Sequence, residues 1–161
     1  MAAAGDAEEP SVVFAFANSS SAENIAIGKE DNEWASTGHG QGRLGAHWKK
    51  SGGHLYIFFH DYNGEGNEKM RGIARVRGPS DSRTPARWVG GTYGSRWTIE
   101  WLTKESFDSK PFAHLRDMDL VPSSLAIQML RKMAPHDSAV RSLSAAAAAQ
   151  EGQRTITSFF T

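Results

Sequence analysis

Three aromatic residues in this sequence stand where a ring could bind a ligand instead of filling a core. Trp34 lies in a polar stretch, Glu33–Gly38, and Trp88 and Tyr93 lie in another, at 88–94. Neither stretch has the periodicity that would place these rings in a core. Ring faces attract polarised N-methyl groups and stack on nucleobases, which is worth about 1–3 kcal/mol per stacked base. Three such rings could therefore enclose a flat, methylated ligand and exclude water from it.

The last nine residues, 153–161, carry a second set of side chains suited to binding. Gln153 is followed by Ile156 and by the pair Phe159 and Phe160. Positions three and four apart share one face of a helical turn, so the three apolar side chains can enter one pocket of a partner while the Gln153 amide forms a separate hydrogen bond. This pattern resembles the clamp-binding box of proteins that dock on the eukaryotic sliding clamp, PCNA. A terminus that is apolar by chance is the alternative.

Composition excludes several other kinds of site. Cysteine is absent, which excludes disulfides, thiolate metal sites and cysteine nucleophiles, and the six histidines show no metal-ligand spacing. Lys+Arg and Asp+Glu are both 18, so the formal net charge is zero, and nucleic-acid affinity must come from a local patch and from base contacts. Because the sequence contains neither a signal peptide nor an apolar run of membrane-spanning length, we expect a soluble nuclear or cytosolic monomer without metal or cofactor.

The chain divides into four segments. Residues 1–10 are an acidic, alanine-rich tail predicted to be disordered, and residues 11–134 have the mixed polarity and turn signals of one domain. Residues 135–152 are predicted to be a flexible linker, because the alanine run at 145–149 is too short to hold a helix in isolation. The linker would give the terminal peptide, 153–161, the reach to bind a clamp while the domain binds something else.

Hydrophobic periodicity predicts the elements of the domain. Alternating residues predict strands at 11–16, 54–60, 70–77 and 96–102, and the loop containing Asn63-Gly64 joins the middle two as a hairpin. Helices are predicted at 20–28, between a serine cap and a closing glycine, and at 41–48 and 123–133. Trp97 and Trp101 have the spacing of core residues on one strand. The fold class is therefore mixed α and β (α+β), with a small, mostly antiparallel or barrel-like central sheet flanked by helices.

A series of motifs follows a characteristic order along this domain. They are Trp34-Ala-Ser-Thr, Arg43-Leu-Gly-Ala-His-Trp48, Leu55–Phe59, Gly72–Val76, Trp88 with Tyr93, Trp97–Trp101 and Phe112–Leu115. Over about residues 12–133, this series resembles the YTH domain, whose members bind N6-methyladenine in nucleic acid, usually RNA, in a cage of two or three aromatic rings. The resemblance implies a YTH or PUA-like fold and a binding function without catalysis.

The resemblance also assigns roles to individual residues. Trp34 and Trp88 would form the opposing walls of the cage, and Tyr93 its third side, where relatives usually have Trp or Leu. Asn24 would face a ring nitrogen of the base, for which a neutral amide is a suitable donor. The backbone carbonyl of Ala35 would accept the remaining N6 hydrogen. Without the resemblance, Asn24 would be read as a helix-surface residue.

Four further positions are assigned from the same pattern. Ser20 stands where relatives often have Asn or Tyr in contact with the base, and Asn18 stands where a Lys that binds the nucleic-acid backbone is common. Arg116 and Asp117 match an Arg-Asp pair of the family after a shortened loop, and with Asn18 they are assigned to contacts with the nucleic-acid backbone. The resemblance makes Arg116 the candidate for a phosphate contact.

These features predict a nuclear reader of N6-methyladenine in single-stranded RNA or DNA that is tethered to PCNA by its C-terminal peptide. One alternative is a conventional YTH reader of mRNA whose tail match is accidental. A base-modification or repair enzyme would need a nucleophile or activated water beside a flipped base, and Glu23, Asp31 and Glu33 are better explained as solvated residues. The last alternative is a clamp-binding adaptor with a degenerate cage.

Overall fold

The computed structural model of this 161-residue chain describes residues 12–19, 21–36, 38–61, 69–81, 87–88, 96–133, 135 and 137–160. For residues 38–39, 80–81 and 153–160 it describes the backbone alone. The strands are β1 (Val13–Ser19), β2 (Glu33–Trp34), β3 (Leu55–Asp61), β4 (Lys69–Asp81), β5 (Arg96–Thr103), β6 (Phe107–Asp108) and β7 (Asp119–Leu120). The α-helices are α1 (Ala22–Asp31), α2 (Gly38–Ser51), α3 (Ser123–Met133) and α4 (Ser138–Phe160).

The strands form one mixed sheet with the order β2-β5-β4-β3-β1-β7, and β6 pairs with β4. The predicted hairpin is confirmed, since β3 and β4 pair antiparallel. In contrast, β1 and β3 pair in parallel, and the connection between them contains α1 and α2. The expected α/β class with flanking helices is therefore confirmed. The barrel-like closure is not found in the described part of the chain, because the sheet ends in the two-residue strands β2 and β7, which do not pair with each other.

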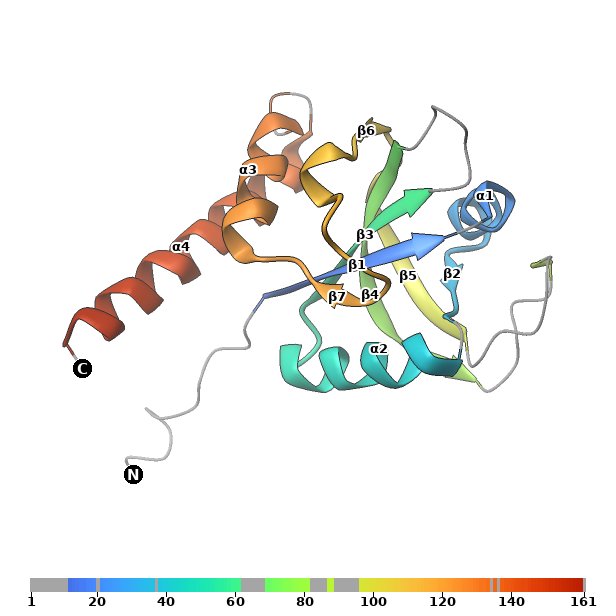
Figure 1. Cartoon of the computed structure of the whole chain (residues 1–161), viewed down its shortest axis with the longest axis horizontal. Helices are drawn as coiled ribbons and strands as arrows, with labels where there is room; N and C mark the ends of the chain where they lie inside the picture. The colour runs from blue at the N-terminus through green and yellow to red at the C-terminus, as the bar shows by residue number, and fades with distance from the viewer. Residues whose placement is uncertain are drawn as a thin grey trace.

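The sheet is buried on both faces (Figure 1). Successive side chains of a strand point to opposite faces, and in β1 Val13 and Ala15 join one core cluster while Phe14 and Phe16 join the other. The first cluster includes residues of α1 and α2, and the second includes residues of α3 and α4. A strand covered on both faces reads as a nearly continuous apolar run, which matches the sequence of β1.

The C-terminal helix corrects the linker prediction for residues 135–152. The structure forms α4 there, and its side chains Val140, Leu143 and Ala147 are 0%, 6% and 4% exposed. The Oδ1 atom of Asp137 accepts hydrogen bonds from the backbone N–H groups of Ala139 and Val140, which caps the helix. The helix propensity of the alanine run is not enough to form a helix in isolation. The helix is stable because its apolar stripe packs on α3 and on the sheet.

Two kinds of feature are absent from the described residues. None of the helices in this part of the chain combines the length and the apolar character needed to cross a membrane. None of the His, Asp and Glu side chains described gather in a group of three that could hold a metal ion.

Candidate functional site

The end of α1 and the short strand β2 fix the position of Trp34. Helix α1 continues past the predicted stop at Gly28 and ends at Asn32, which takes the left-handed conformation with φ 56°. Gly28 leaves room for the returning chain, because a Cβ there would lie 2.9 Å from the carbonyl oxygen of Glu33 and 3.6 Å from the Trp34 ring. Strand β2 then pairs Trp34 with Trp97 of β5. Trp34 is only 4% exposed, so the expectation that its ring lies outside the core is wrong.

Trp88 lies directly against Trp34. The two ring centroids are 4.8 Å apart and the ring planes are inclined by 73°, so the edge of one ring meets the face of the other. Two parallel walls around a base would have to be roughly 7 Å apart, because carbon atoms in contact are separated by about 3.5 Å. The structure thus brings the two predicted cage walls together, but in contact with each other and not as opposing walls with a gap.

Arg87, next to Trp88 in the chain, is bound to α1. Its guanidinium donates hydrogen bonds to both carboxylate oxygens of Asp31, at 2.9 and 2.8 Å, and to Glu30, at 2.6 Å. The hydrogen bond from Arg87 lowers the pKa of Asp31 below its ordinary value, and the carboxylates raise the pKa of Arg87. Asp31 is therefore a partner of the residue next to Trp88, and not simply the solvated residue that the sequence indicated.

Asn24 is buried on α1 and is not a helix-surface residue. Its side chain is 1% exposed, and it shares the buried face of α1 with Gly28, one helical turn later. Since Gly28 adjoins the Trp34 ring, Asn24 lies within about one turn of that ring. A buried amide next to an aromatic face can donate to a ring nitrogen of a flat ligand, whereas no nucleophile or metal cluster accompanies it among the described residues.

A second polar cluster adjoins Ala35, which is 2% exposed. Asp117 accepts hydrogen bonds from the backbone N–H of Asn18, at 2.9 Å, and from the hydroxyl of Ser36. Burial raises the pKa of Asp117, and these two hydrogen bonds and the charge of Arg43 oppose that rise. The Asp117 carboxylate is therefore occupied inside the fold, next to the segment that carries Ala35.

The other residues predicted to contact the nucleic-acid backbone are Asn18 and Arg116, and the structure places them differently. The side-chain oxygen of Asn18 lies 2.7 Å from Nδ1 of His60, so this amide is also used within the fold. Arg116 is exposed, and its backbone N–H donates to Asp119. Arg43 of α2 pairs with Asp119 at 3.1 Å and is itself partly exposed, which the sequence reasoning did not single out.

Several predicted site residues lie outside what the structure describes. Ser20 and Tyr93 are outside the described residues, and so are the side chains of Gln153, Ile156, Phe159 and Phe160. Their assigned roles stay predictions.

Sequence reasoning missed the residues that position the site. Arg87 directly precedes a predicted cage tryptophan and pairs with the adjacent acidic residues Glu30 and Asp31. The opposite charges of these residues were a signal in the sequence that could have identified Arg87. Ser36 and Gly40 act through contacts with residues distant in sequence, which no local pattern reveals.

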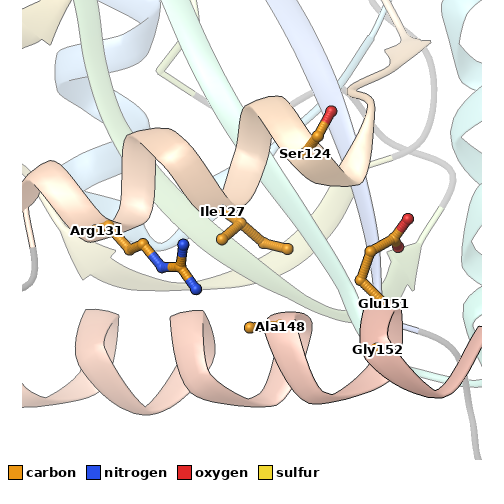
Figure 2. A pocket seen from close by; sticks show the side chains of 6 residues that line it. All are labelled: Ser124, Ile127, Arg131, Ala148, Glu151 and Gly152. Carbon is orange, nitrogen blue, oxygen red and sulfur yellow. The ribbon is translucent and has the colours of Figure 1, made fainter. Parts of the chain in front are cut away.

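The pocket between α3 and α4 lies on the other face of the sheet from this site (Figure 2). It has a volume of about 360 Å³ and is lined by Ser124, Ile127, Arg131, Ala148, Glu151 and Gly152. It belongs to the packing of α4 on α3 and shares no residue with the aromatic pair.

Comparison with protein families gives one match that covers most of the chain. The model of the YT521-B-like domain (YTH) matches residues 13–134. The zebrafish (Danio rerio) YTH domain-containing family protein 2 is 31% identical over 121 residues, covering 65% of this chain and 19% of the relative. The mouse (Mus musculus) YTH domain-containing family protein 1 is 29% identical over 119 residues, covering 64% of this chain and 21% of the relative. The chain therefore spans about a fifth of the length of these curated relatives.

Solved structures share the fold. The Pho92 YTH domain in complex with m6A superposes with a TM-score of 0.65 at 23% identity, covering 81% of this chain and 88% of that one. The YTH domain of the Zygosaccharomyces rouxii MRB1 protein, in complex with N6-methyladenosine RNA, also gives a TM-score of 0.65, at 17% identity, covering 74% of this chain and 84% of that one.

Proposed function

The chain belongs to the YT521-B-like (YTH) domain family, and we propose that it is a non-catalytic reader of N6-methyladenine in single-stranded RNA. The observation that carries the proposal is the contact of Trp34 and Trp88, with the buried amide of Asn24 one helical turn from Gly28, which adjoins the Trp34 ring. The two similar solved structures, which hold m6A and N6-methyladenosine RNA, support the choice of ligand. Methyladenine in single-stranded DNA is the second candidate, and the same titration tests it.

In this proposal, the ring of Trp88 moves away from Trp34 and the methylated base takes its place. The base stacks on the ring faces, where its polarised methyl group is attracted and water is excluded. Asn24 donates to a ring nitrogen, and the backbone carbonyl of Ala35 accepts the remaining N6 hydrogen. Tyr93 closes the third side. Selectivity arises because the methyl group exchanges water for ring faces, whereas an unmethylated amine loses hydration without that gain.

A titration of the full chain against four matched single-stranded oligonucleotides tests the proposal, with methylated and unmethylated versions of RNA and of DNA at one fixed salt concentration. We expect methylation to tighten binding, and more so in RNA. Trp88→Ala should remove most of this discrimination, because about 1–3 kcal/mol of stacking is lost. Trp48→Ala is the matched control, since Trp48 is a partly buried ring that packs on Trp97 and not on Trp88. Equal affinity for all four strands would reject the reader.

We further propose that the C-terminal peptide binds the PCNA clamp and that the protein acts in the nucleus. The backbone of α4 is helical up to Phe160, which supports a shared face for positions 156, 159 and 160. The apolar residues would enter a pocket of the clamp, and Gln153 would hydrogen-bond beside it. A conventional reader of mRNA with an accidental tail match is the alternative.

Replacing Phe159 and Phe160 together with Ala separates these alternatives. We expect the double variant to lose binding to purified PCNA and to keep wild-type affinity for methylated RNA, because the tail continues from α4, which packs in the second core cluster, whereas the aromatic pair belongs to the first. Thr157→Ala is the control within the same peptide. If the wild-type chain shows no binding to PCNA at concentrations where known clamp-binding peptides saturate, the tail match is accidental.

A further inference from the structure

We propose that Asp117 is a positioning residue that sets the location of the base-edge contacts in the proposed reader. Its carboxylate joins two segments that each lead to a predicted contact. One is the end of β1, which leads through the Ser21 cap to Asn24 on α1, and the other is the segment that contains Ala35. The inference rests on the proposed function for its ligand, but the contacts themselves are in the free protein.

Ala35 lies between two anchors. On one side, Trp34 pairs with Trp97 in the sheet. On the other side, the hydroxyl of Ser36, which is 6% exposed, donates a hydrogen bond to Asp117. The β-pairing of Trp34 holds Ala35 on its N-terminal side only, and the hydrogen bond between Ser36 and Asp117 holds it on the other side. The position of that carbonyl relative to Asn24 therefore depends on the carboxylate.

The first turn of α2 encloses the same carboxylate. A Cβ on Gly40 would collide with Oγ of Ser36 and would come within 2.9 Å of Oδ2 of Asp117. Helix α2 has no acidic residue in its own first turn, so Asp117 supplies the negative charge that a helix N-terminus favours. The next residue, Met118, is also held by hydrogen bonds. Its backbone N–H donates to the carbonyl oxygen of Phe16, and its own carbonyl oxygen lies 2.9 Å from Nε2 of His47.

The two contacts are stronger with a carboxylate than with an amide. Two donors, the Asn18 N–H and the Ser36 hydroxyl, converge on the side chain of Asp117, and an ionised carboxylate has two acceptor oxygens. Asn at this position would still accept from the Asn18 N–H and would donate to the Ser36 oxygen, but both hydrogen bonds would lose the assistance of the negative charge. A carboxylate that accepts two internal hydrogen bonds is also a poor phosphate contact, which distinguishes this role from binding of the nucleic-acid backbone.

The first experiment uses the free protein. We expect Asp117→Asn to speed backbone amide hydrogen exchange across residues 34–36, measured by NMR, relative to the wild type. Asp108→Asn is the control, because it removes the same charge from an exposed side chain that accepts a hydrogen bond from the backbone N–H of Lys110. Unchanged exchange at 34–36 would overturn the inference, whatever the protein binds.

The second experiment is a double-mutant cycle on binding, with Ser36→Ala, Asp117→Asn and the combined variant. Each single change should weaken affinity for methylated single-stranded RNA roughly ten-fold, the effect of losing one charge-assisted hydrogen bond, and leave affinity for the unmethylated strand nearly unchanged. The combined variant should bind no more weakly than either single one. Losses that multiply, or that are equal for both strands, would reject positioning in favour of a direct phosphate contact or a general loss of folding.

Two glycine substitutions in α2 distinguish a positioning effect from a general loss of folding. Gly40→Ala should reduce methyladenine affinity as Asp117→Asn does, because its Cβ would displace Ser36 and Asp117. Gly42→Ala should leave binding unchanged and raise thermal stability, because its Cβ would have no neighbour within 4 Å and Ala favours the helix. Wild-type binding by the Gly40 variant would contradict the proposal. If the wild type itself does not distinguish methylated RNA, the reader fails, while the amide-exchange result still decides the role of Asp117.

Discussion

At the scale of single residues, Arg87 determines where Trp88 lies. Its guanidinium forms three hydrogen bonds to two acidic residues of α1, and the neighbouring indole packs on Trp34. We expect Arg87→Ala to weaken affinity for methylated RNA only about two- to five-fold, since solvent screens exposed ion pairs. Arg77→Ala is the matched control, because Arg77 is an exposed arginine paired with Glu100. Equal binding by both variants in the titration would remove Arg87 from the site.

The same ion pair has a pH dependence of definite sign. Arg87 lowers the pKa of Asp31, so the folded state binds fewer protons there than the unfolded state. The stabilisation is present above the ordinary aspartate range, near about 4, and is lost as pH falls through the lowered pKa. Asp31→Asn should therefore lower the thermal unfolding temperature at pH 7 and have little effect at about pH 2. A difference that persists at the low pH would assign the effect to another interaction.

Residue types were predicted better than residue geometry. The sequence and the resemblance named Trp34 and Trp88, and the structure brings them together. The sequence did not predict that Trp34 is buried, because its burial depends on pairing with Trp97 and on the space above Gly28. Pairing between segments far apart in the chain leaves no local pattern. The same reason explains why Ser36 was overlooked.

At the scale of elements, α4 shows how packing outweighs propensity. Its alanine run is too short to form a helix alone, but Val140, Leu143 and Ala147 are spaced so that they lie on one face and are buried. This stripe was present in the sequence and could have predicted the helix. The strands were easier to predict, because alternation within each strand is a local signal, as in β5 with its buried Trp97 and Ile99.

The contribution of α4 to stability can be measured. Leu143→Ala should reduce the free energy of unfolding by about 2–4 kcal/mol, because the buried side chain leaves a cavity between α4 and the second core cluster. Ser142→Ala, at the neighbouring exposed position, should change it by less than about 0.5 kcal/mol. Denaturant unfolding measures both. Equal stability of the two variants would mean that α4 is not held on the domain in solution.

At the scale of the whole molecule, the formal net charge of zero limits attraction to phosphates. We expect a shallow salt dependence, in which the logarithm of the binding constant for methylated RNA falls with a slope of about −0.7 per neutralised phosphate and one or two phosphates are involved. Arg116→Ala should make the slope shallower by about 0.7 if Arg116 is one of the contacts. A slope several times steeper would show that contacts with the RNA phosphates, and not with the base, dominate the affinity.

The two proposed binding functions lie with opposite faces of the sheet. The aromatic pair belongs to the cluster with α1 and α2, and the terminal peptide continues from a helix on the opposite cluster. In Figure 1, the C-terminal end of α4 extends to the left beyond the sheet, on the side opposite α1. A partner bound at that end would therefore leave the aromatic pair accessible.

Helix α4 also decides how this protein should be divided for experiments. The family match ends at residue 134, before α4 begins. A fragment cut at that boundary would lose Val140, Leu143 and Ala147 and the contact of the Val12 N–H with the side chain of Gln150, at 2.8 Å. The uncovered face of α3 and the sheet would then be an apolar surface prone to aggregation. Weak binding by such a fragment would reflect its aggregation, and not the affinity of the intact chain for its ligand.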